Sequence, residues 1–268
     1  MPIPKIIHYC WFGRNPKPKL AKKCIKSWKK YCKGYEIKEW NEDNFDISKA
    51  PLYVRQAYEA KKWGFVPDYI RLWIIYNYGG IYLDTDVEII KPLDDLLENK
   101  AFAGFETPSN VVALGLGFAA EPGNRIIKEL MDSYNDLSFI NQDGTLNMIP
   151  APTLNSEVFR KIGLKENNTN QMLEDMTIYS SEYFCPIDTF SMKLNKTKST
   201  YTIHHFMGSW VSDEDKVKEK ESRKKRRKDE RKWKRRDSLH SFIHFPNRAA
   251  KKIFGDSFYS KLKAIVKK

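Results

Sequence analysis

The segment that most constrains the fold is "PDYIRLWIIYNYGGIYLDTDVEII", residues 67–90. A proline opens an apolar helical pattern, and a Gly-Gly pair ends the helix before a short apolar strand. The strand ends in Asp84 and Asp86. Alternate side chains of an extended chain point the same way, so the two carboxylates can lie on one side. Two like charges placed together need a cation or strong hydrogen-bond donors to offset them.

The periodicity of the remaining chain predicts alternating strands and helices, which indicates the α/β class. Strands are expected at 4–13, 35–40, 81–90 (interrupted by the acidic turn), 101–105, 111–118, 176–179 and 200–206. Helices are expected at 17–32, 52–62, 67–78, 123–135 and 153–162, and the polar stretch 165–171 is expected to be a surface loop.

Composition supports one sizeable domain with an appendage. Of the 268 residues, 41% are hydrophobic and 13% aromatic, which is enough to bury a core. No stretch of about 18 uncharged apolar residues is present, so no transmembrane helix is predicted. The four cysteines form no CxxC pair, and free thiols in a reducing cytosol are expected.

Charge divides the chain into a neutral part and a basic part. Residues 1–212 carry 26 Lys and Arg against 25 Asp and Glu, whereas residues 213–268 carry 21 against 9. We therefore expect a globular domain at 1–212, a highly basic solvated helix or linker at 213–237 and an amphipathic basic tail at 238–268. Four apolar residues of that tail fall on one helical stripe: Phe254, Phe258, Leu262 and Ile265.

Three interpretations compete for Asp84 and Asp86. A solvated turn needs no ligand, because Asp commonly accepts local backbone hydrogen bonds. The haloacid-dehalogenase-type phosphatases also end a strand with Asp-x-Asp, but that motif lies on the first strand, whereas about 80 residues precede it here. The third interpretation is the DxD metal site of a nucleotide-sugar glycosyltransferase, because a hard divalent cation prefers oxygen ligands and can bridge carboxylates to a diphosphate.

Three motifs in order favour the third interpretation. Residues 68–86 follow the pattern D-x-x-R, apolar helix, Gly-Gly and [IV]-Y-x-D-x-D, which resembles the glycosyltransferase family 32 sugar transferases of capsular polysaccharide synthesis. The large clostridial glucosylating toxins share the pattern more distantly. "IPKIIHYCWFG" at 3–13 resembles the opening strand of the family, and "YTIHHFMGSW" at 201–210 resembles its closing segment.

The resemblance implies a GT-A type nucleotide-binding fold, a divalent cation (Mn²⁺ or Mg²⁺) and retention of the α-anomeric configuration. It places Asp84 near the ribose and the metal, and Asp86 as the direct metal ligand. Trp11 matches a tryptophan that stacks on the nucleotide base. An indole at the carboxyl end of a first strand suits that role, although a core aromatic is the alternative.

Asp68 and Arg71 lie three residues apart and are therefore neighbours on one helix face. As a surface ion pair they would contribute only about 0–1 kcal/mol. The resemblance instead makes both of them clamps on the hydroxyls of the donor sugar, with Asp accepting and Arg donating, so we count them with the catalytic residues. A charged clamp orients the anomeric carbon for reaction.

The late motif contains His204, His205, Ser209 and Trp210. Adjacent histidines on a strand face opposite ways, so at most one is expected to meet the metal, and we favour His204. Imidazole nitrogen suits Mn²⁺ better than Mg²⁺. The toxin branch implies that Ser209 binds the metal and that Trp210 donates its indole N–H near the leaving phosphate oxygen.

The expected function is a metal-dependent retaining hexosyltransferase that moves a sugar from a nucleotide donor, expected to be UDP-linked, to a lipid-linked surface-polysaccharide acceptor. The basic tail suggests peripheral attachment to the anionic inner face of the cell membrane from the cytoplasm. Aromatic residues are sparse within 213–237, so no nucleic-acid partner is expected. The alternative is a non-catalytic nucleic-acid or membrane adaptor built on a glycosyltransferase-like domain.

Overall fold

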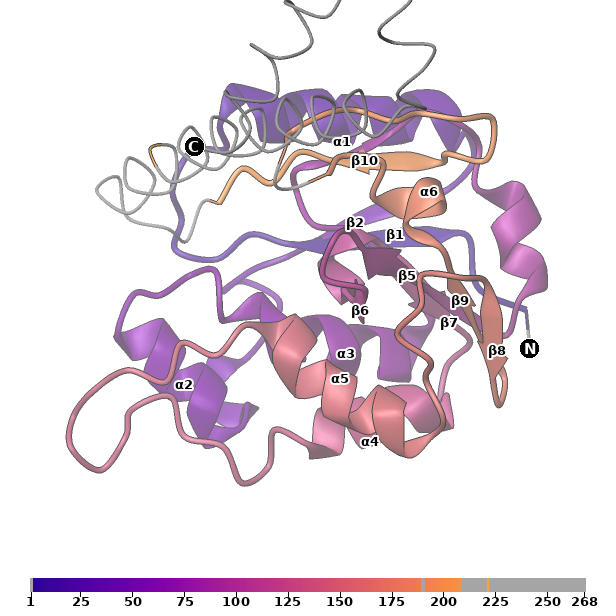
Figure 1. Cartoon of the computed structure of the whole chain (residues 1–268). Helices are drawn as coiled ribbons and strands as arrows, with labels where there is room; N and C mark the ends of the chain where they lie inside the picture. Colours follow the sequence, from indigo (N-terminus) through magenta and orange to yellow (C-terminus); the bar gives the residue numbers. More distant parts are fainter. Residues whose placement is uncertain (1, 189–190, 209–220, 222–268) are drawn as a thin grey trace, which may run out of the picture. The chain divides into compact units, whose positions relative to one another are not determined.

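A computed structural model describes residues 2–188, 191–208 and 221 of the chain (Figure 1). The expectations for the linker at 213–237 and the tail at 238–268 therefore fall outside the described residues, apart from the single residue 221.

The described part is built on one large mixed sheet and one small one. The large sheet has the order β2-β1-β3-β7-β5-β9-β8, and β6 pairs with β5 at its side. Its strands are β1 (Ile6–Cys10), β2 (Glu36–Trp40), β3 (Gly80–Tyr82), β5 (Ala101–Glu106), β6 (Val111–Val112), β7 (Phe118–Ala120), β8 (Gln171–Leu173) and β9 (Met176–Tyr179). The small sheet pairs β4 (Val87–Ile89) with β10 (Thr202–His204).

Strand direction places the carboxyl ends of five strands at one edge. Strand β1 is parallel to β2 and β3, and β5 is parallel to β9. Strand β7 is antiparallel to both β3 and β5, so β3 and β5 run the same way. Ligands of open α/β sheets bind outside the carboxyl ends of the strands, so this edge is where a site is expected.

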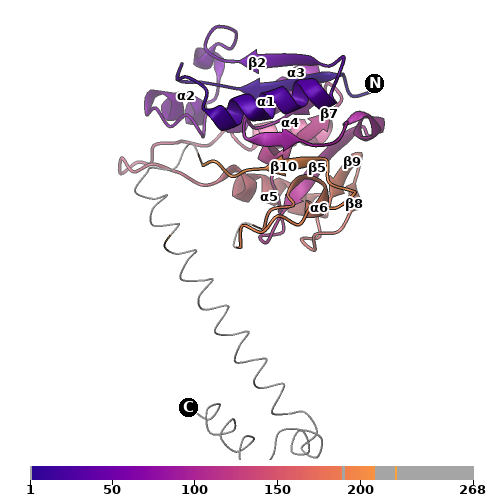
Figure 2. The same ribbon diagram turned by 90° about the horizontal axis from the view of Figure 1, so that it is seen from above.

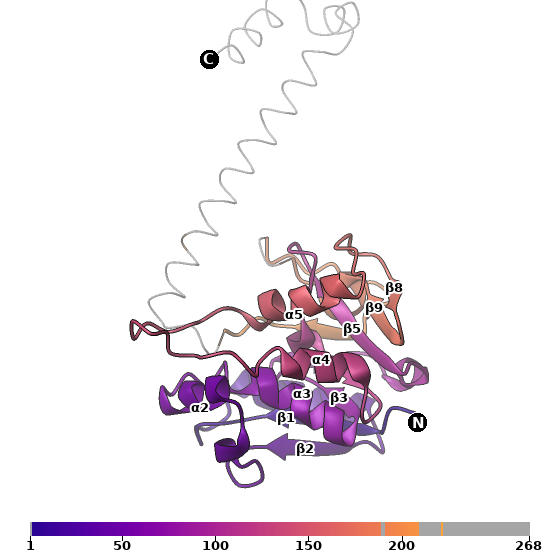
Figure 3. The same cartoon turned by 90° about the horizontal axis from the view of Figure 1, so that it is seen from below.

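Helices cover both faces of the large sheet (Figures 2 and 3). One face carries α2 (Leu52–Glu59), α3 (Pro67–Tyr78), α4 (Arg125–Asp132) and α5 (Ala151–Lys161). The other carries α1 (Lys19–Tyr31), α6 (Ser181–Phe184) and the small sheet. A separate apolar core fills each side, because successive residues of β1 such as Tyr9 and Cys10 contribute to different cores. The predicted α/β class is confirmed.

Most predicted elements are present, with shorter bounds. The single strand expected at 111–118 is wrong: β6 ends at Val112, a short 3-10 helix occupies Leu114–Leu116, and β7 begins only at Phe118. Gly117 lies between them at φ +126°, which is outside the extended region that a regular strand occupies. Strand β8 and helix α6 were not predicted, and the loop expected at 165–171 ends where β8 begins. The four cysteines are free and buried.

The Gly-Gly pair makes the turn from α3 into β3, as predicted. Gly79 has φ 64° and Gly80 φ +94°. A Cβ on Gly80 would lie 2.8 Å from the carbonyl oxygen of Ile6, so only glycine lets β3 approach β1 this closely. The buried His8 secures the same turn, because its Nε2 lies 3.1 Å from the carbonyl oxygen of Gly79 and its Nδ1 accepts from Trp40 Nε1.

Candidate metal and sugar-donor site

Two strand pairings bring the acidic turn and the late histidines together. Asp84 follows β3, and Asp86 immediately precedes β4. Strand β10 is antiparallel to β4 with His204 opposite Val87, so the histidine arrives beside the turn. One ligand atom each from Asp84, Asp86 and His204 lies within 4.8 Å of the others. This is the one such three-residue group of His, Cys, Asp and Glu within the described part of the chain.

Asp86 is held by donors on both carboxylate oxygens. His204 Nε2 lies 3.1 Å from Oδ1, and the backbone N–H of Met207 donates to Oδ2 at 2.8 Å. The backbone N–H of His205 donates to the Asp86 carbonyl at 3.0 Å. Burial would raise the pKa of Asp86, but His204 and the Met207 N–H outweigh it and lower the pKa to about 2. Asp86 is therefore ionised at neutral pH.

His204 is the side chain that pairs with the Asp86 carboxylate. Burial lowers the pKa of an imidazole, but Asp86, Asp84 and Glu106 together raise the pKa of His204 above its ordinary value. Its second ring nitrogen, Nδ1, is buried and has no hydrogen-bond partner among the described residues. A buried ring nitrogen without a partner is costly, and a ligand would satisfy it.

Asp84 is held less completely than Asp86. Its Oδ1 lies 3.5 Å from Nη1 of Arg71, and its backbone N–H donates to the carbonyl of Gly115 at 3.4 Å. Burial raises the pKa of Asp84, and the neighbouring Asp86 adds to this, while Arg71 opposes it. An added positive charge at this point would favour the ionised carboxylate.

Asp68 and Arg71 form a buried pair on α3, with side chains 8% and 7% exposed. Arg71 Nη2 donates to Asp68 Oδ1, its Nε donates to the carbonyl of Pro67, and its guanidinium lies over the ring of Tyr82. The interpretation of Asp68 and Arg71 as a solvent-exposed ion pair is therefore wrong. Arg71 bridges Asp68 and Asp84, which ties the helix to the acidic turn.

The two histidines point in different directions, as strand alternation predicts. His205 Nε2 lies 2.8 Å from Glu88 Oε2, and Lys23 Nζ donates to the same oxygen at 2.9 Å. His205 thus belongs to a surface network beside α1, and His204 belongs to the acidic group.

Trp11 lies directly after β1, at the same edge as Asp84. Its indole Nε1 donates to the carbonyl of Asn15 at 2.6 Å, and Lys17 Nζ lies 5.6 Å from its ring centre. The ring is partly exposed rather than part of the buried core. Ser209 and Trp210, predicted for the metal and the leaving phosphate, lie outside the described residues.

Residues 18–103 match the family described as "Glycosyltransferase sugar-binding region containing DXD motif". This segment is similar to the sugar-binding regions of glycosyltransferases that contain a DXD motif. The resemblance inferred from the sequence is confirmed at that level, and membership of family 32 stays a prediction. The matched segment 18–103 contains Asp68, Arg71, Asp84 and Asp86, whereas Trp11 and the late histidines lie outside it.

Two curated relatives share parts of the chain. Inositol phosphoceramide mannosyltransferase 3 of Schizosaccharomyces pombe is 34% identical over 121 residues, which is 44% of this chain and 33% of the relative. The chain thus spans about a third of that relative's length. An uncharacterised glycosyltransferase of Acanthamoeba polyphaga mimivirus is 26% identical over 220 residues, covering 78% of this chain and 84% of the relative. Among solved structures, the PaToxG glycosyltransferase is 20% identical with a TM-score of 0.46, covering 60% of this chain and 70% of that one.

Three contributors to the site were not found from the sequence. Gly115, in the 3-10 turn beyond the matched segment 18–103, borders Asp84, and Met207 supplies a backbone donor to Asp86. Trp28 of α1 donates from Nε1 to the carbonyl of Val87 at 2.7 Å and so holds β4. The close spacing of Gly115 and Gly117 was the sequence feature that could have indicated the close approach of Gly115 to Asp84. The backbone donor Met207 and the indole donor Trp28 have no local sequence pattern that would indicate their partners.

Proposed function

We propose that this chain is a metal-dependent, retaining glycosyltransferase that takes its sugar from a nucleotide donor, with a UDP-sugar as the first candidate. The observation that carries the proposal is the convergence of Asp84, Asp86 and His204 at the carboxyl edge of the sheet, next to the Asp68–Arg71 pair. The match of residues 18–103 to a DXD sugar-binding region supports the same chemistry.

The donor atoms present suit a divalent cation. Two carboxylates and one imidazole form a mixed oxygen and nitrogen set, which favours Mn²⁺ over Mg²⁺. The unpaired Nδ1 of His204 and the incompletely compensated charge of Asp84 are both features that a cation would relieve. Asp84, Asp86 and His204 would hold the ion, with Ser209 as the further predicted ligand. Such an ion supplies charge neutralisation for a departing nucleoside diphosphate.

The chain's own side chains would position the sugar. Arg71 has its guanidinium fixed by Asp68, the Pro67 carbonyl and the ring of Tyr82, so it can donate to sugar hydroxyls without losing much conformational freedom. Asp68 would accept from a neighbouring hydroxyl. Trp11 would stack on the base, and Trp210 would donate to the leaving phosphate.

A lipid-linked glycan is the acceptor that we propose, at the inner face of the cell membrane. The name of the Schizosaccharomyces pombe relative states an activity on inositol phosphoceramide, which is itself a lipid. The basic segment 213–268, with 21 Lys and Arg against 9 Asp and Glu, is suited to an anionic leaflet. None of the helices in the described ranges is sufficiently long and apolar to cross a bilayer.

A thermal-shift screen of nucleotide sugars with and without Mn²⁺ tests the donor assignment. A ligand that binds the native state raises its melting temperature, so a UDP-sugar with Mn²⁺ is expected to give the largest rise. Asp86→Asn should abolish the Mn²⁺-dependent part, whereas Asp132→Asn on α4 is a matched control that should retain it. A non-catalytic adaptor would show no metal-dependent response to any nucleotide sugar.

A further inference from the structure

Helix α1 carries an unbroken ridge of lysines that the proposed site does not use. The helix contains six lysines and no acidic residue in its 13 residues. All six are exposed, and they recur at spacings of three and four residues, which places them along one side of the helix. The lysine ridge consists of Lys19, Lys22, Lys23, Lys26, Lys29 and Lys30. At a rise of about 1.5 Å per residue it is roughly 16 Å long.

The ridge works against the stability of its own helix. Like charges three or four residues apart repel each other, and Lys19 and Lys22 in the first turn oppose the helix dipole, whereas Lys29 and Lys30 in the last turn are favoured by it. Among the described residues, only Lys23 of the ridge makes an ion pair, with Glu88. The other five lysines have no acidic partner among the described residues, as on a surface that meets an anionic partner.

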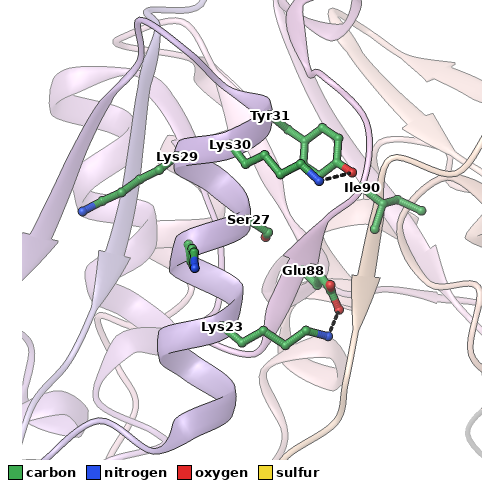
Figure 4. Close-up of a pocket in the computed structure, with 8 residues that line it drawn as sticks. Lys23, Ser27, Lys29, Lys30, Tyr31, Glu88 and Ile90 are labelled. Atoms are coloured by element: carbon green, nitrogen blue, oxygen red, sulfur yellow. Dashed lines mark hydrogen bonds and ion pairs between the residues drawn. The ribbon is translucent and has the colours of Figure 1, made fainter.

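A groove lies beside the ridge, with a volume of about 590 Å³. Figure 4 shows it between α1 and the chain at Glu88 of β4 and Ile90, the residue directly after this strand. Its walls combine lysine ammonium groups with the apolar surface of Tyr31 and Ile90. Glu88 also lines the groove, and its carboxylate is paired with Lys23 and His205. Lys30 lies over the Tyr31 ring, with its Nζ 4.7 Å from the ring centre. Cationic groups beside an aromatic ring and an aliphatic side chain suit the boundary between phosphate headgroups and acyl chains.

We propose that the lysine ridge of α1 is a docking surface for an anionic phospholipid bilayer. A straight row of flexible ammonium groups matches a plane of negative headgroups, and each lysine near such a surface strengthens binding. Nucleic acid is less suited, because its recognition uses aromatic platforms or a groove-entering element that α1, packed along the sheet, does not offer. The proposal concerns the folded domain and is independent of the tail at 213–268.

Docking at α1 would also orient the proposed catalytic site. Trp28 on the buried side of α1 holds the Val87 carbonyl, and the Ile89 N–H donates to Ser27 Oγ at 2.9 Å. Strand β4 begins directly after Asp86. Helix α1, which would contact the bilayer, is therefore hydrogen-bonded to β4, the strand that follows the turn with Asp84 and Asp86. This connection would keep the proposed site at a fixed distance from a lipid-linked acceptor.

Flotation of the full-length chain with vesicles tests the proposal. The test variant is Lys22→Gln/Lys26→Gln/Lys29→Gln, and its matched control is Lys161→Gln/Lys165→Gln/Lys196→Gln, which removes the same charge from exposed sites elsewhere. The vesicles are phosphatidylcholine alone or phosphatidylcholine with phosphatidylglycerol. The ridge variant is expected to bind the anionic vesicles about 100-fold more weakly than the wild type, because each of the three lysines contributes about fivefold. The control should stay close to the wild type.

Three results would contradict the proposal. Equal weakening of binding in the ridge and control variants would assign attachment to net charge or to the tail. The ridge variant could keep vesicle binding and lose binding to a random-sequence RNA, which would assign the ridge to nucleic acid. A melting temperature below that of the wild type would give these lysines a structural role. Metal-dependent donor hydrolysis by the ridge variant should be unchanged, so failure here is distinguishable from failure of the proposed function.

Discussion

Gly115 leaves no space between its backbone and the carboxylate of Asp84. A Cβ at this position would collide with Oδ2 of Asp84 and lie 3.2 Å from Nη1 of Arg71. The Asp84 N–H donates to the Gly115 carbonyl, so the two backbones are also joined. The turn at residues 114–116 therefore acts as a wall against which the first aspartate of the motif is placed.

Replacing Gly115 with alanine should displace Asp84. A shift of about 1 Å in a catalytic group can cost about 100-fold in rate, so Gly115→Ala is expected to lower metal-dependent donor hydrolysis by about 10- to 100-fold. Overpacking should lower the free energy of unfolding by only about 1–3 kcal/mol. Gly163→Ala is the matched control, because Gly163 has φ +96° but open space around it. That control should lose some stability and keep its activity; equal losses of activity in both variants would refute the role of Gly115.

Removal of Arg71 should expose the dependence of the fold on the buried pair. Arg71→Met leaves Asp68 buried without its partner, and we expect the free energy of unfolding in urea to fall by about 3–5 kcal/mol. The double variant Asp68→Leu/Arg71→Met replaces both charges and should recover most of this stability. Donor hydrolysis should stay absent in both variants, because both lack the Arg71 guanidinium that we propose donates to the sugar hydroxyls. If the double variant regains activity along with stability, Asp68 and Arg71 have a structural role and do not bind the donor sugar.

The indole of Trp11 should contribute to donor affinity and little to folding. Stacking of a base on an aromatic side chain contributes about 1–3 kcal/mol, so Trp11→Ala is expected to raise KM for the nucleotide sugar by about 5- to 100-fold. Trp11→Phe keeps a ring and should lose much less. Steady-state kinetics together with urea unfolding separates the two roles. If Trp11→Ala chiefly lowers stability and leaves KM unaltered, the residue is a packing element.

The buried His8 should make the fold sensitive to acid. Burial lowers the pKa of His8 from 6.5 to about 4, against the raising effect of its bond to the Gly79 carbonyl. Between these values the unfolded chain binds the proton more readily, so stability falls as the pH falls from 6.5 to 4. From pH 7 to pH 5 this one group should remove about 2 kcal/mol of unfolding free energy.

Urea unfolding of His8→Gln at both pH values measures that contribution. The variant should be less stable at pH 7, since Nδ1 no longer accepts from Trp40, but its loss between pH 7 and pH 5 should be smaller by about 2 kcal/mol. His240→Gln, in the basic tail, should follow the wild type. An unchanged pH dependence in His8→Gln would place the acid-sensitive group elsewhere.

The parts of the site that follow from local geometry could be predicted. The Gly-Gly turn, the closeness of Asp84 and Asp86, and the different directions of the two histidines all depend on neighbouring residues in the chain. The reason given for the aspartates was wrong, however, because β3 ends at Tyr82 and the two carboxylates meet across a turn rather than along an extended strand. The choice of His204 agrees with the geometry, because it is the histidine that meets Asp86.

The parts that depend on long-range pairing could not be predicted. The burial of Asp68 and Arg71 arises from packing of α3 on the sheet, and sequence spacing alone was also compatible with a solvated pair. Gly115 meets Asp84 only because β7 returns beside β3, and Glu88 meets His205 only because β10 pairs with β4. Such contacts are set by strand register, which the local pattern of short strands does not specify.

Release of UDP from UDP-sugars by the full-length chain, measured with Mn²⁺ and then with excess chelator, tests the central claim most directly. The account predicts turnover with at least one UDP-sugar that chelation stops and Mn²⁺ restores, and that Asp86→Asn loses without unfolding. Hydrolysis that persists in chelator, or in Asp86→Asn, would contradict it.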